Sequence, residues 1–234
     1  MAKNLADDRC VNAVTRAELA RLLDHSVLKP EATERDIREG ADIVRSWRIG
    51  FYCVQPCWVK LAAEMLAGTD ACIVSVVSFP HGCDRSDVKA QAALLAVDDG
   101  AREIDMVMNF GALKGGDDAR VAADVDIVVR AVPRIPVKVI LETTALTDGE
   151  KQRACRIVVD AGARFVKTST GFHPSGGATV ADVRLLRAAV GKTVGVKASG
   201  GIRTLADARA MLDAGANRLG TSASAAILGA LADR

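Results

Sequence analysis

The chain has 234 residues, of which 50% are hydrophobic, 26% are charged and only 3% are aromatic. Its length suits one large domain or two small ones with an aliphatic core, and a net charge of +2 with interspersed acids and bases excludes the strong field that nucleic acid or an anionic membrane would require. The first residues, Met1–Asp8, lack the apolar core of a secretory signal, and no later apolar run approaches membrane-spanning length, which predicts a soluble, cytoplasmic protein.

Segments with strand character alternate along the chain with segments of helical periodicity. The predicted strands are Leu22–Leu28, Ile49–Val54, Cys72–Phe79, Glu103–Asn109, Val137–Thr143, Arg164–Ser169, Val194–Ser199 and Asn217–Gly220. The predicted helices between them include Ala32–Trp47, Ser86–Asp98, Asp117–Val132, Thr147–Ala161, Val180–Val190 and Thr204–Ala214. About eight strands is the number that closes a parallel barrel of roughly 250 residues.

A concealed internal repeat supports the barrel. Three times a helix ends at a glycine followed by alanine, and a strand starts at once, as in Asp99-Gly-Ala-Arg-Glu-Ile-Asp105. Counting five residues on from each glycine leads to Asp105, Lys167 and Gly220. These positions lie on alternate strands, which contribute side chains to the same interior level of a barrel, so we expect an acid, a lysine and a glycine at one height.

Nothing in the sequence divides or cross-links the chain. Without a Pro- or Ser-rich linker or a charge block, residues 1–234 are predicted to form a single domain. The predicted fold class is α/β, a (β/α)8 TIM barrel with a short helix before the first strand, and a doubly wound open sheet is the alternative. The six cysteines lack ligand spacing and the three histidines lie far apart, so neither a disulfide framework nor a metal site is predicted.

Ionisable residues interrupt several of these strands, although parallel strands covered by helices are usually apolar. They are Asp24, Asp105, Lys138, Glu142, Lys167 and Lys197. Taken singly, each one is best interpreted as a member of a structural ion-pair network or as a strand end that reaches solvent. Taken together they favour an active site, because Lys167 and Lys197 come late in their strands, just before the loops where barrel active sites lie.

The two lysines indicate amine chemistry. A lysine that is crowded by a second cation and partly desolvated has its ammonium form disfavoured, and lowering its pKa from about 10.4 to near 7 is worth about 4.6 kcal/mol. A neutral Lys167 could attack a carbonyl and form a Schiff base, while Asp105 transfers protons and Lys197 holds or relays charge. Gly200-Gly-Ile-Arg203 and Gly220-Thr-Ser222 follow the last two strands and lead into helices whose free N–H groups favour a phosphate.

Seven segments resemble, in order, the signatures of the 2-deoxyribose-5-phosphate aldolase family, whose members are class I aldolases with a (β/α)8 barrel. The resemblance covers nearly the whole chain. The matching segments are Leu23–Pro30, Val54–Pro56, Glu103–Asn109, Lys138–Thr143, Phe165–Gly171, Val196–Arg203 and Arg218–Ser222.

The resemblance implies a role for each matching residue. It implies that Lys167 forms the Schiff base, that Lys197 is the second active-site lysine and that Asp105 transfers protons. It also implies that Asp24 helps to order the proton relay and that Lys138 pairs with the active-site acids. The residues expected at or beside the phosphate are Gly171, Gly200, Gly201, Arg203, Gly220 and Ser222, and those expected to line the site are Thr168 and Thr170.

The implied reaction is the reversible cleavage of 2-deoxy-D-ribose 5-phosphate to acetaldehyde and D-glyceraldehyde 3-phosphate in deoxyribonucleotide catabolism, with no metal or organic cofactor. The expected partners are these small molecules, with no nucleic acid and no membrane, and a homodimer paired through outer helices is the assembly considered. Three alternatives stay open at this point. They are another Schiff-base lyase on the same barrel, a phosphate-binding isomerase or synthase with purely electrostatic lysines, and a non-catalytic ligand-binding barrel.

The chain departs from the family pattern at two positions beside the expected phosphate site. Phe172 stands where some relatives carry a lysine that assists the phosphate, and Ala223 stands where many have a serine. Arg203 is expected to compensate for the missing lysine. Cys53 matches a position near the substrate in some relatives, and its simplest interpretation is a packed thiol.

Overall fold

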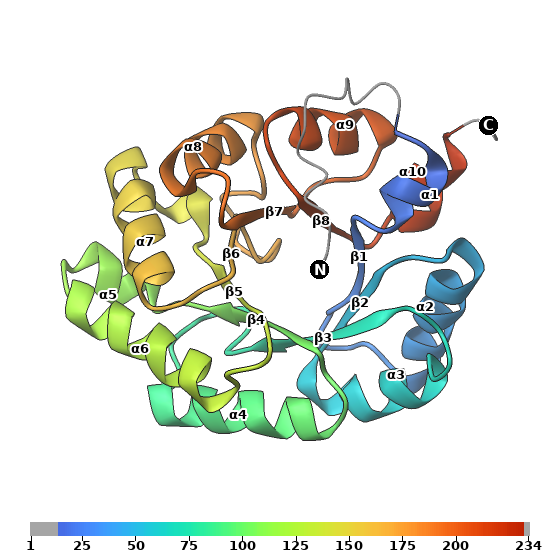
Figure 1. Ribbon diagram of the computed structural model, residues 1–234, viewed down its shortest axis with the longest axis horizontal. Coiled ribbons are helices and arrows are strands. Elements are labelled where there is room, and N and C mark those ends of the chain that lie inside the picture. Colours follow the sequence, from blue (N-terminus) through green and yellow to red (C-terminus); the bar gives the residue numbers. More distant parts are fainter. Residues whose placement is uncertain (1–13, 232–234) are drawn as a thin grey trace.

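A computed structural model describes residues 14–231 and shows a closed barrel of parallel strands surrounded by helices (Figure 1). The strands neighbour one another in chain order, and the last pairs with the first. Their bounds are β1 Leu23–Val27, β2 Phe51–Val54, β3 Cys72–Val77, β4 Glu103–Val107, β5 Val137–Ile140, β6 Phe165–Lys167, β7 Gly195–Ser199 and β8 Arg218–Thr221. The predicted (β/α)8 barrel is confirmed, and the open-sheet alternative is wrong because β8 pairs with β1.

The helices form the outer ring in Figure 1 and include the short helix predicted before the first strand. Their bounds are α1 Arg16–Ala20, α2 Glu34–Trp47, α3 Val59–Met65, α4 Ser86–Asp98, α5 Phe110–Lys114, α6 Asp118–Ala131, α7 Asp148–Asp160, α8 Val180–Val190, α9 Leu205–Asp213 and α10 Ser224–Gly229. The three short helices α3, α5 and α10 were not predicted, because two turns or fewer carry little periodicity. Within residues 14–231, no helix is both long and apolar enough to cross a membrane.

Several helices start at a threonine that caps the first turn. Thr33, Thr147 and Thr204 each accept a hydrogen bond from the backbone N–H three residues later. The acid at that later position bonds back to the threonine N–H, so two otherwise unpaired donors are satisfied at once. These caps explain why the predicted starts of α2, α7 and α9 differ from the observed starts by only one or two residues.

The strand register decides which side chains share a level inside the barrel. In an eight-stranded barrel with the shear of a TIM barrel, residues at the same height are found in two steps. One follows the ladder pairs across two strands, and then moves two residues further along the chain. Asp105 pairs with Lys138, which pairs with Phe165, so Lys167 is level with Asp105. Lys167 pairs with Lys197 and Lys197 with Arg218, so Gly220 joins the same level. The register therefore confirms the level predicted from the glycine repeat.

The outward side of β1 carries a buried histidine. His25 is 3% exposed, stacks on Tyr52 with ring centroids 6.0 Å apart, and contacts the hydroxyl of Ser224 through Nδ1 at 3.2 Å. Burial lowers the pKa of His25 from 6.5 to about 4. The folded protein therefore keeps this imidazole neutral at a pH where the unfolded chain protonates it.

This histidine predicts a pH dependence of stability. Because the folded pKa lies below the unfolded one, the unfolded chain binds the extra proton between pH 6.5 and 4, and the free energy of unfolding should fall by up to about 3 kcal/mol as the pH falls through that window. Urea unfolding from pH 6.5 to 4.5, above the range where most carboxylates titrate, measures the slope. His25→Gln should flatten it, and a variant with the wild-type slope would contradict the assignment.

Candidate active site

Seven ionisable side chains lie in the barrel interior, each no more than 8% exposed. They come from β1 and from each of the strands β4, β5, β6, β7 and β8. They are Asp24, Glu103, Asp105, Lys138, Lys167, Lys197 and Arg218. Since a buried charge is tolerated only when it is paired, their arrangement decides whether this interior is stable.

Asp105 is the centre of the cluster and contacts three ammonium groups. Its Oδ1 lies 2.8 Å from Nζ of Lys138, and its Oδ2 lies 2.8 Å from Nζ of Lys167 and 2.7 Å from Nζ of Lys197. Burial by itself would raise the pKa of Asp105, but these three cations hold that pKa well below its usual range. Asp105 is therefore a carboxylate at neutral pH.

The other two acids connect the lysines to Arg218. Glu103 lies 2.6 Å from Nζ of Lys138 and 3.2 Å from the Arg218 guanidinium. Asp24 accepts from Lys197 and, at 2.9 Å, from Arg218. Burial would lower the pKa of Lys197, yet Asp105 and Asp24 raise it above its ordinary value, so Lys197 stays charged.

The guanidinium of Arg218 lies deeper in the barrel, between two aromatic rings. Its central carbon is 3.1 Å from the centroid of the Phe51 ring and 5.6 Å from that of Phe165. The strand register puts Phe51, Glu103, Phe165 and Arg218 on one level, below the level of Asp105. A planar cation can stack between rings while donating in plane to two carboxylates, so this level forms the floor of the cluster.

Charge is unevenly shared within the cluster. The seven side chains include three carboxylates and four bases, which leaves one positive charge in excess when all are ionised. Lys138, Lys197 and Arg218 each contact two carboxylates, whereas Lys167 contacts Asp105 alone among the described residues. Lys167 therefore loses the fewest ion pairs if its nitrogen reacts with another group.

The structure thus brings together Asp24, Asp105, Lys138, Lys167 and Lys197 and adds two residues that the sequence reasoning missed. Glu103 and Arg218 stand two positions before Asp105 and Gly220. A period of two puts such residues on the same face of a strand, so extending the glycine repeat backwards would have found both. Both were overlooked because they are the first residues of their strands, where a charge usually reaches solvent.

The predicted phosphate-binding glycines lie in the loops after β6 and β7. Gly171, Gly200 and Gly201 have φ values of 83°, 89° and 81°, a region that glycine adopts readily. A Cβ on Gly171 would lie 3.4 Å from the Cα of Gly200, so the two loops touch. Within residues 14–231, the backbone N–H groups of Gly171, Gly200 and Gly201 donate no hydrogen bond, and neither does that of Ser222 in the loop after β8. Free N–H groups of this kind suit an anion.

Two residues of the predicted phosphate set lie elsewhere. Gly220 is inside the barrel, where a Cβ would come within 3.2 Å of Cε of Lys197, so its position makes room for that lysine. Arg203 is exposed, and its backbone N–H donates to Asp207 at 3.0 Å. Their phosphate roles stay predictions.

The threonines predicted to line the site each brace a loop. The Thr168 hydroxyl donates to the Ser199 carbonyl at 3.2 Å and accepts from the Ser199 N–H at 3.0 Å, which joins β6 to β7. The Thr170 hydroxyl donates to Glu142 at 2.5 Å. Glu142 was predicted inside a strand but lies just after β5 in a left-handed conformation, because the ladder ends at Ile140. It takes part in no ion pair of the interior cluster.

The opposite wall of the interior is apolar. Leu28, Cys53, Val74 and Val76 pack together there, and Phe79 covers them. Cys53 is 1% exposed and burial raises its pKa to about 11, which confirms the packed thiol. The ring of Phe172 meets that of Phe79 edge to face with centroids 5.2 Å apart, so the loop after β6 reaches towards the loop after β3.

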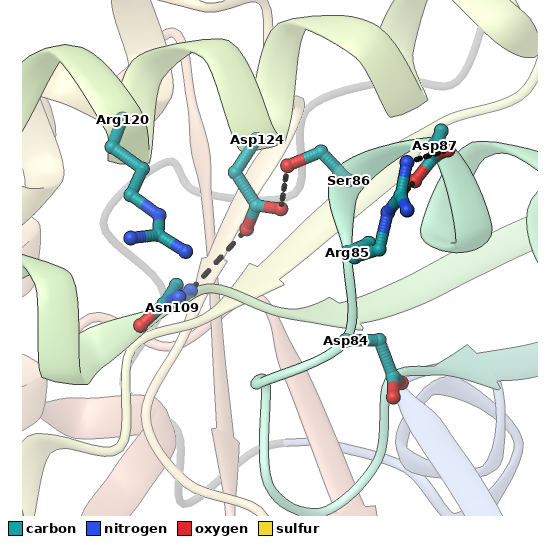
Figure 2. A pocket seen from close by; sticks show the side chains of 7 residues that line it. All are labelled: Asp84, Arg85, Ser86, Asp87, Asn109, Arg120 and Asp124. Carbon is teal, nitrogen blue, oxygen red and sulfur yellow. Dashed lines mark hydrogen bonds and ion pairs between the residues drawn. The ribbon is translucent and has the colours of Figure 1, made fainter.

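A separate polar cavity of about 220 Å³ lies between α4 and α6 (Figure 2). One of its lining residues, Asp124, belongs to a buried ion pair: Nζ of Lys89 lies 2.6 Å from Asp124 and also donates to the carbonyls of Gly82 and Val107. Figure 2 shows Asp124 directed at the Ser86 hydroxyl and the Asn109 backbone, to which it bonds at 2.8 and 3.3 Å. The pair ties α4 and α6 to the end of β4, which is a structural task.

Fold and site together define a class of protein. A closed (β/α)8 barrel with a buried lysine beside a carboxylate, at the carboxyl ends of its strands, is an enzyme built to use an amine on a carbonyl compound. Comparison with known proteins identifies the family more closely. The chain belongs to the DeoC/LacD family of aldolases, whose family model matches residues 19–232. The protein is therefore a carbon–carbon lyase.

Individual relatives agree with this assignment. A deoxyribose-phosphate aldolase of Bacillus mycoides (strain KBAB4) is 50% identical over 211 residues, which cover 90% of this chain and 94% of the relative. One of Enterococcus faecalis (strain ATCC 700802 / V583) is 48% identical over 212 residues, with 90% and 96% covered. The solved structure of a deoxyribose phosphate aldolase from Aeropyrum pernix, described as a unique tetramer, superposes with a TM-score of 0.86 at 30% identity, covering 92% of this chain and 91% of that one.

The buried pair beside the cavity of Figure 2 yields a stability prediction. Asp124→Ala leaves the Lys89 ammonium buried without its carboxylate, and breaking such a pair costs about 3–5 kcal/mol of unfolding free energy. Urea denaturation measures the loss. The matched control is Asp126→Ala, which removes an exposed pair with Arg130 on the same helix and should cost no more than about 1 kcal/mol. Equal losses for the two variants would contradict the structural role.

Proposed function

We propose that this protein catalyses the reversible aldol cleavage of 2-deoxy-D-ribose 5-phosphate to D-glyceraldehyde 3-phosphate and acetaldehyde, through a Schiff base on Lys167. The observation that carries the proposal is the contact of Asp105 with three lysines, of which Lys167 has this acid as its single carboxylate partner among the described residues. The substrate follows from relatives whose amino-acid sequences are about half identical to this chain and which bear the name deoxyribose-phosphate aldolase.

In the proposed binding step, the phosphate accepts from the free backbone N–H groups of Gly171, Gly200, Gly201 and Ser222. The carbon chain of the sugar then extends from these loops down to Lys167. The side chain of Lys167 lies below the loops and is 3% exposed. The ammonium of Lys167 gives a proton to Asp105 or to water, and the neutral amine adds to the aldehyde carbon, C1 of the open-chain sugar. Return of that proton with loss of water from the resulting carbinolamine gives a cationic imine.

In the cleavage step, the electrons of the bond between C2 and C3 move towards the imine and leave an enamine. The hydroxyl at C3 loses its proton as C3 becomes the carbonyl carbon of D-glyceraldehyde 3-phosphate. We assign this proton to Asp105, directly or through a water molecule, with Lys197 and Lys138 stabilising the carboxylate from either side. Asp24 keeps Lys197 charged and in place.

Release of acetaldehyde reverses the formation of the imine on Lys167. Protonation of the enamine at C2 gives the imine of acetaldehyde, and hydrolysis frees the lysine. The apolar wall of Leu28, Val74 and Val76 offers the two-carbon unit a surface without hydrogen-bonding groups. Every proton in this sequence is moved by a side chain of the cluster or by water.

Two further features remain proposals. A homodimer is the assembly predicted from sequence, and the relative from Aeropyrum pernix is described as a tetramer, so size-exclusion chromatography with light scattering is the measurement that decides the oligomeric state. A cytoplasmic location fits an enzyme that acts on a phosphorylated sugar. The alternative with purely electrostatic lysines lacks support, since the chain belongs to an aldolase family.

Borohydride trapping tests the mechanism. Reduction in the presence of acetaldehyde should add one two-carbon unit to Lys167, located by peptide mapping, and Lys167→Ala should lose turnover by about 10⁴-fold or more while staying folded. The control is Lys60→Ala, which removes an exposed lysine on α3 and should retain labelling and turnover. Measurable turnover with an unlabelled Lys167 would contradict the Schiff-base mechanism.

Competing substrates test the assignment within the aldolases. Cleavage of deoxyribose 5-phosphate should exceed that of fructose 1,6-bisphosphate and of 2-keto-3-deoxy-6-phosphogluconate in kcat/KM. A preference for either of the latter two would overturn the substrate while leaving the lysine chemistry in place.

A further inference from the structure

Glu142 is a buried acid that the proposed chemistry does not use. It is 1% exposed and stands between the end of β5 and the turn at Thr143–Ala145, with φ 59° and ψ 61°. Residues other than glycine rarely adopt this left-handed backbone conformation. Such backbone strain concentrates at functional sites, where the surrounding structure maintains it. Among the described residues Glu142 has no cation partner, so the ion-pair cluster around Asp105 does not explain it.

All hydrogen bonds that the Glu142 carboxylate accepts within residues 14–231 come from one residue. The Thr170 hydroxyl donates to Oε2 at 2.5 Å, and the Thr170 N–H lies 3.3 and 3.4 Å from the two carboxylate oxygens. The distance from the Thr170 hydroxyl lies at the short end of the range for hydrogen bonds between oxygen atoms. The carboxylate therefore fixes both the backbone and the side chain of Thr170.

The fixed threonine sets the conformation of the next two residues. Its hydroxyl accepts from the Phe172 N–H at 3.0 Å, so the N–H groups on both sides of Gly171 are engaged. Among the described residues the N–H of Gly171 has no acceptor, and this glycine has φ 83° and packs against Gly200. Glu142 thus determines which donor of this turn is offered to a ligand.

The attacking lysine is held by different contacts. The N–H of Leu141 donates to the carbonyl of Lys167 at 2.9 Å, and the N–H of Thr143 donates to that of Thr168 at 2.9 Å. These are backbone bonds on either side of Glu142, and they do not depend on its carboxylate. A change confined to the Glu142 side chain should therefore disturb the Gly171 turn and leave the position of Lys167 intact.

We propose that Glu142 is a positioning residue for the substrate phosphate: through Thr170 it holds the free N–H of Gly171 towards the phosphate and so sets the preference for a phosphorylated sugar. This proposal rests on the proposed function. It predicts an effect on phosphate recognition and none on the amine chemistry, which is a division that a merely structural role would not produce.

The test compares kcat and KM for 2-deoxyribose 5-phosphate and for unphosphorylated 2-deoxyribose. Glu142→Gln and Thr170→Val should each lower the ratio of the two kcat/KM values by about tenfold, the effect expected for disrupting one buried hydrogen bond, mainly by raising KM for the phosphorylated sugar. The double variant should lower the ratio no further, because both changes break the same contact. Thr170→Ser, which keeps the hydroxyl, should recover most of the ratio.

Two controls make the outcome decisive. Borohydride trapping of acetaldehyde on Lys167 should proceed in both single variants at a rate within about twofold of the wild-type rate. Glu34→Gln changes an exposed glutamate on α2 and should leave both the ratio and the trapping as they are. Thermal unfolding identifies a misfolded variant, and if Glu142→Gln does not fold, Thr170→Val and Thr170→Ser carry the test.

An unchanged ratio in folded variants, equal losses on both sugars, or additive effects in the double variant would overturn the positioning role. Failure of the proposed function itself has a different signature. In that case the wild-type protein would neither cleave deoxyribose 5-phosphate nor trap acetaldehyde on Lys167.

Discussion

The contact of one carboxylate with three ammonium groups is the interaction on which this structure depends. Asp105 lies fully buried within 2.8 Å of Lys138, Lys167 and Lys197. Three lysines cannot share a dry interior without such an acid, and a buried acid cannot stay ionised without such lysines. Closure of the barrel allows both, because it directs side chains from six strands into one small volume.

The remainder of the interior supports this contact in levels. Glu103 and Arg218, on a floor flanked by aromatic rings, pair with each other and give Lys138 and Asp24 each a further ion-pair partner. The apolar side chains on β2 and β3 keep the opposite wall dry, which strengthens every electrostatic contact nearby. Above both, the glycine loops after β6 and β7 present backbone donors that are not used in the strand ladder. In the proposed function, chemistry and phosphate recognition therefore occupy successive levels of one barrel.

Much of this was predictable from local patterns. The glycine repeat gave the correct level for Asp105 and Lys167, since a fixed count from a helix end to a strand position survives folding. Strand ends were predicted too long, as at Val137–Thr143, because apolar or β-branched residues continue past the last ladder pair. Glu103 and Arg218 were missed because a charge at the start of a strand gives no local sign of whether it turns inward or reaches solvent.

The amino-acid sequence by itself determined the alternation of strands and helices, the positions of the charged residues within the strands and the family resemblance, because each depends on the order of residues along the chain. The tertiary structure alone decided which charges pair, that Lys167 has a single carboxylate partner among the described residues, and that Glu142 bonds to Thr170. These contacts join residues 28 to 194 positions apart, and only barrel closure and shear bring them within bonding distance.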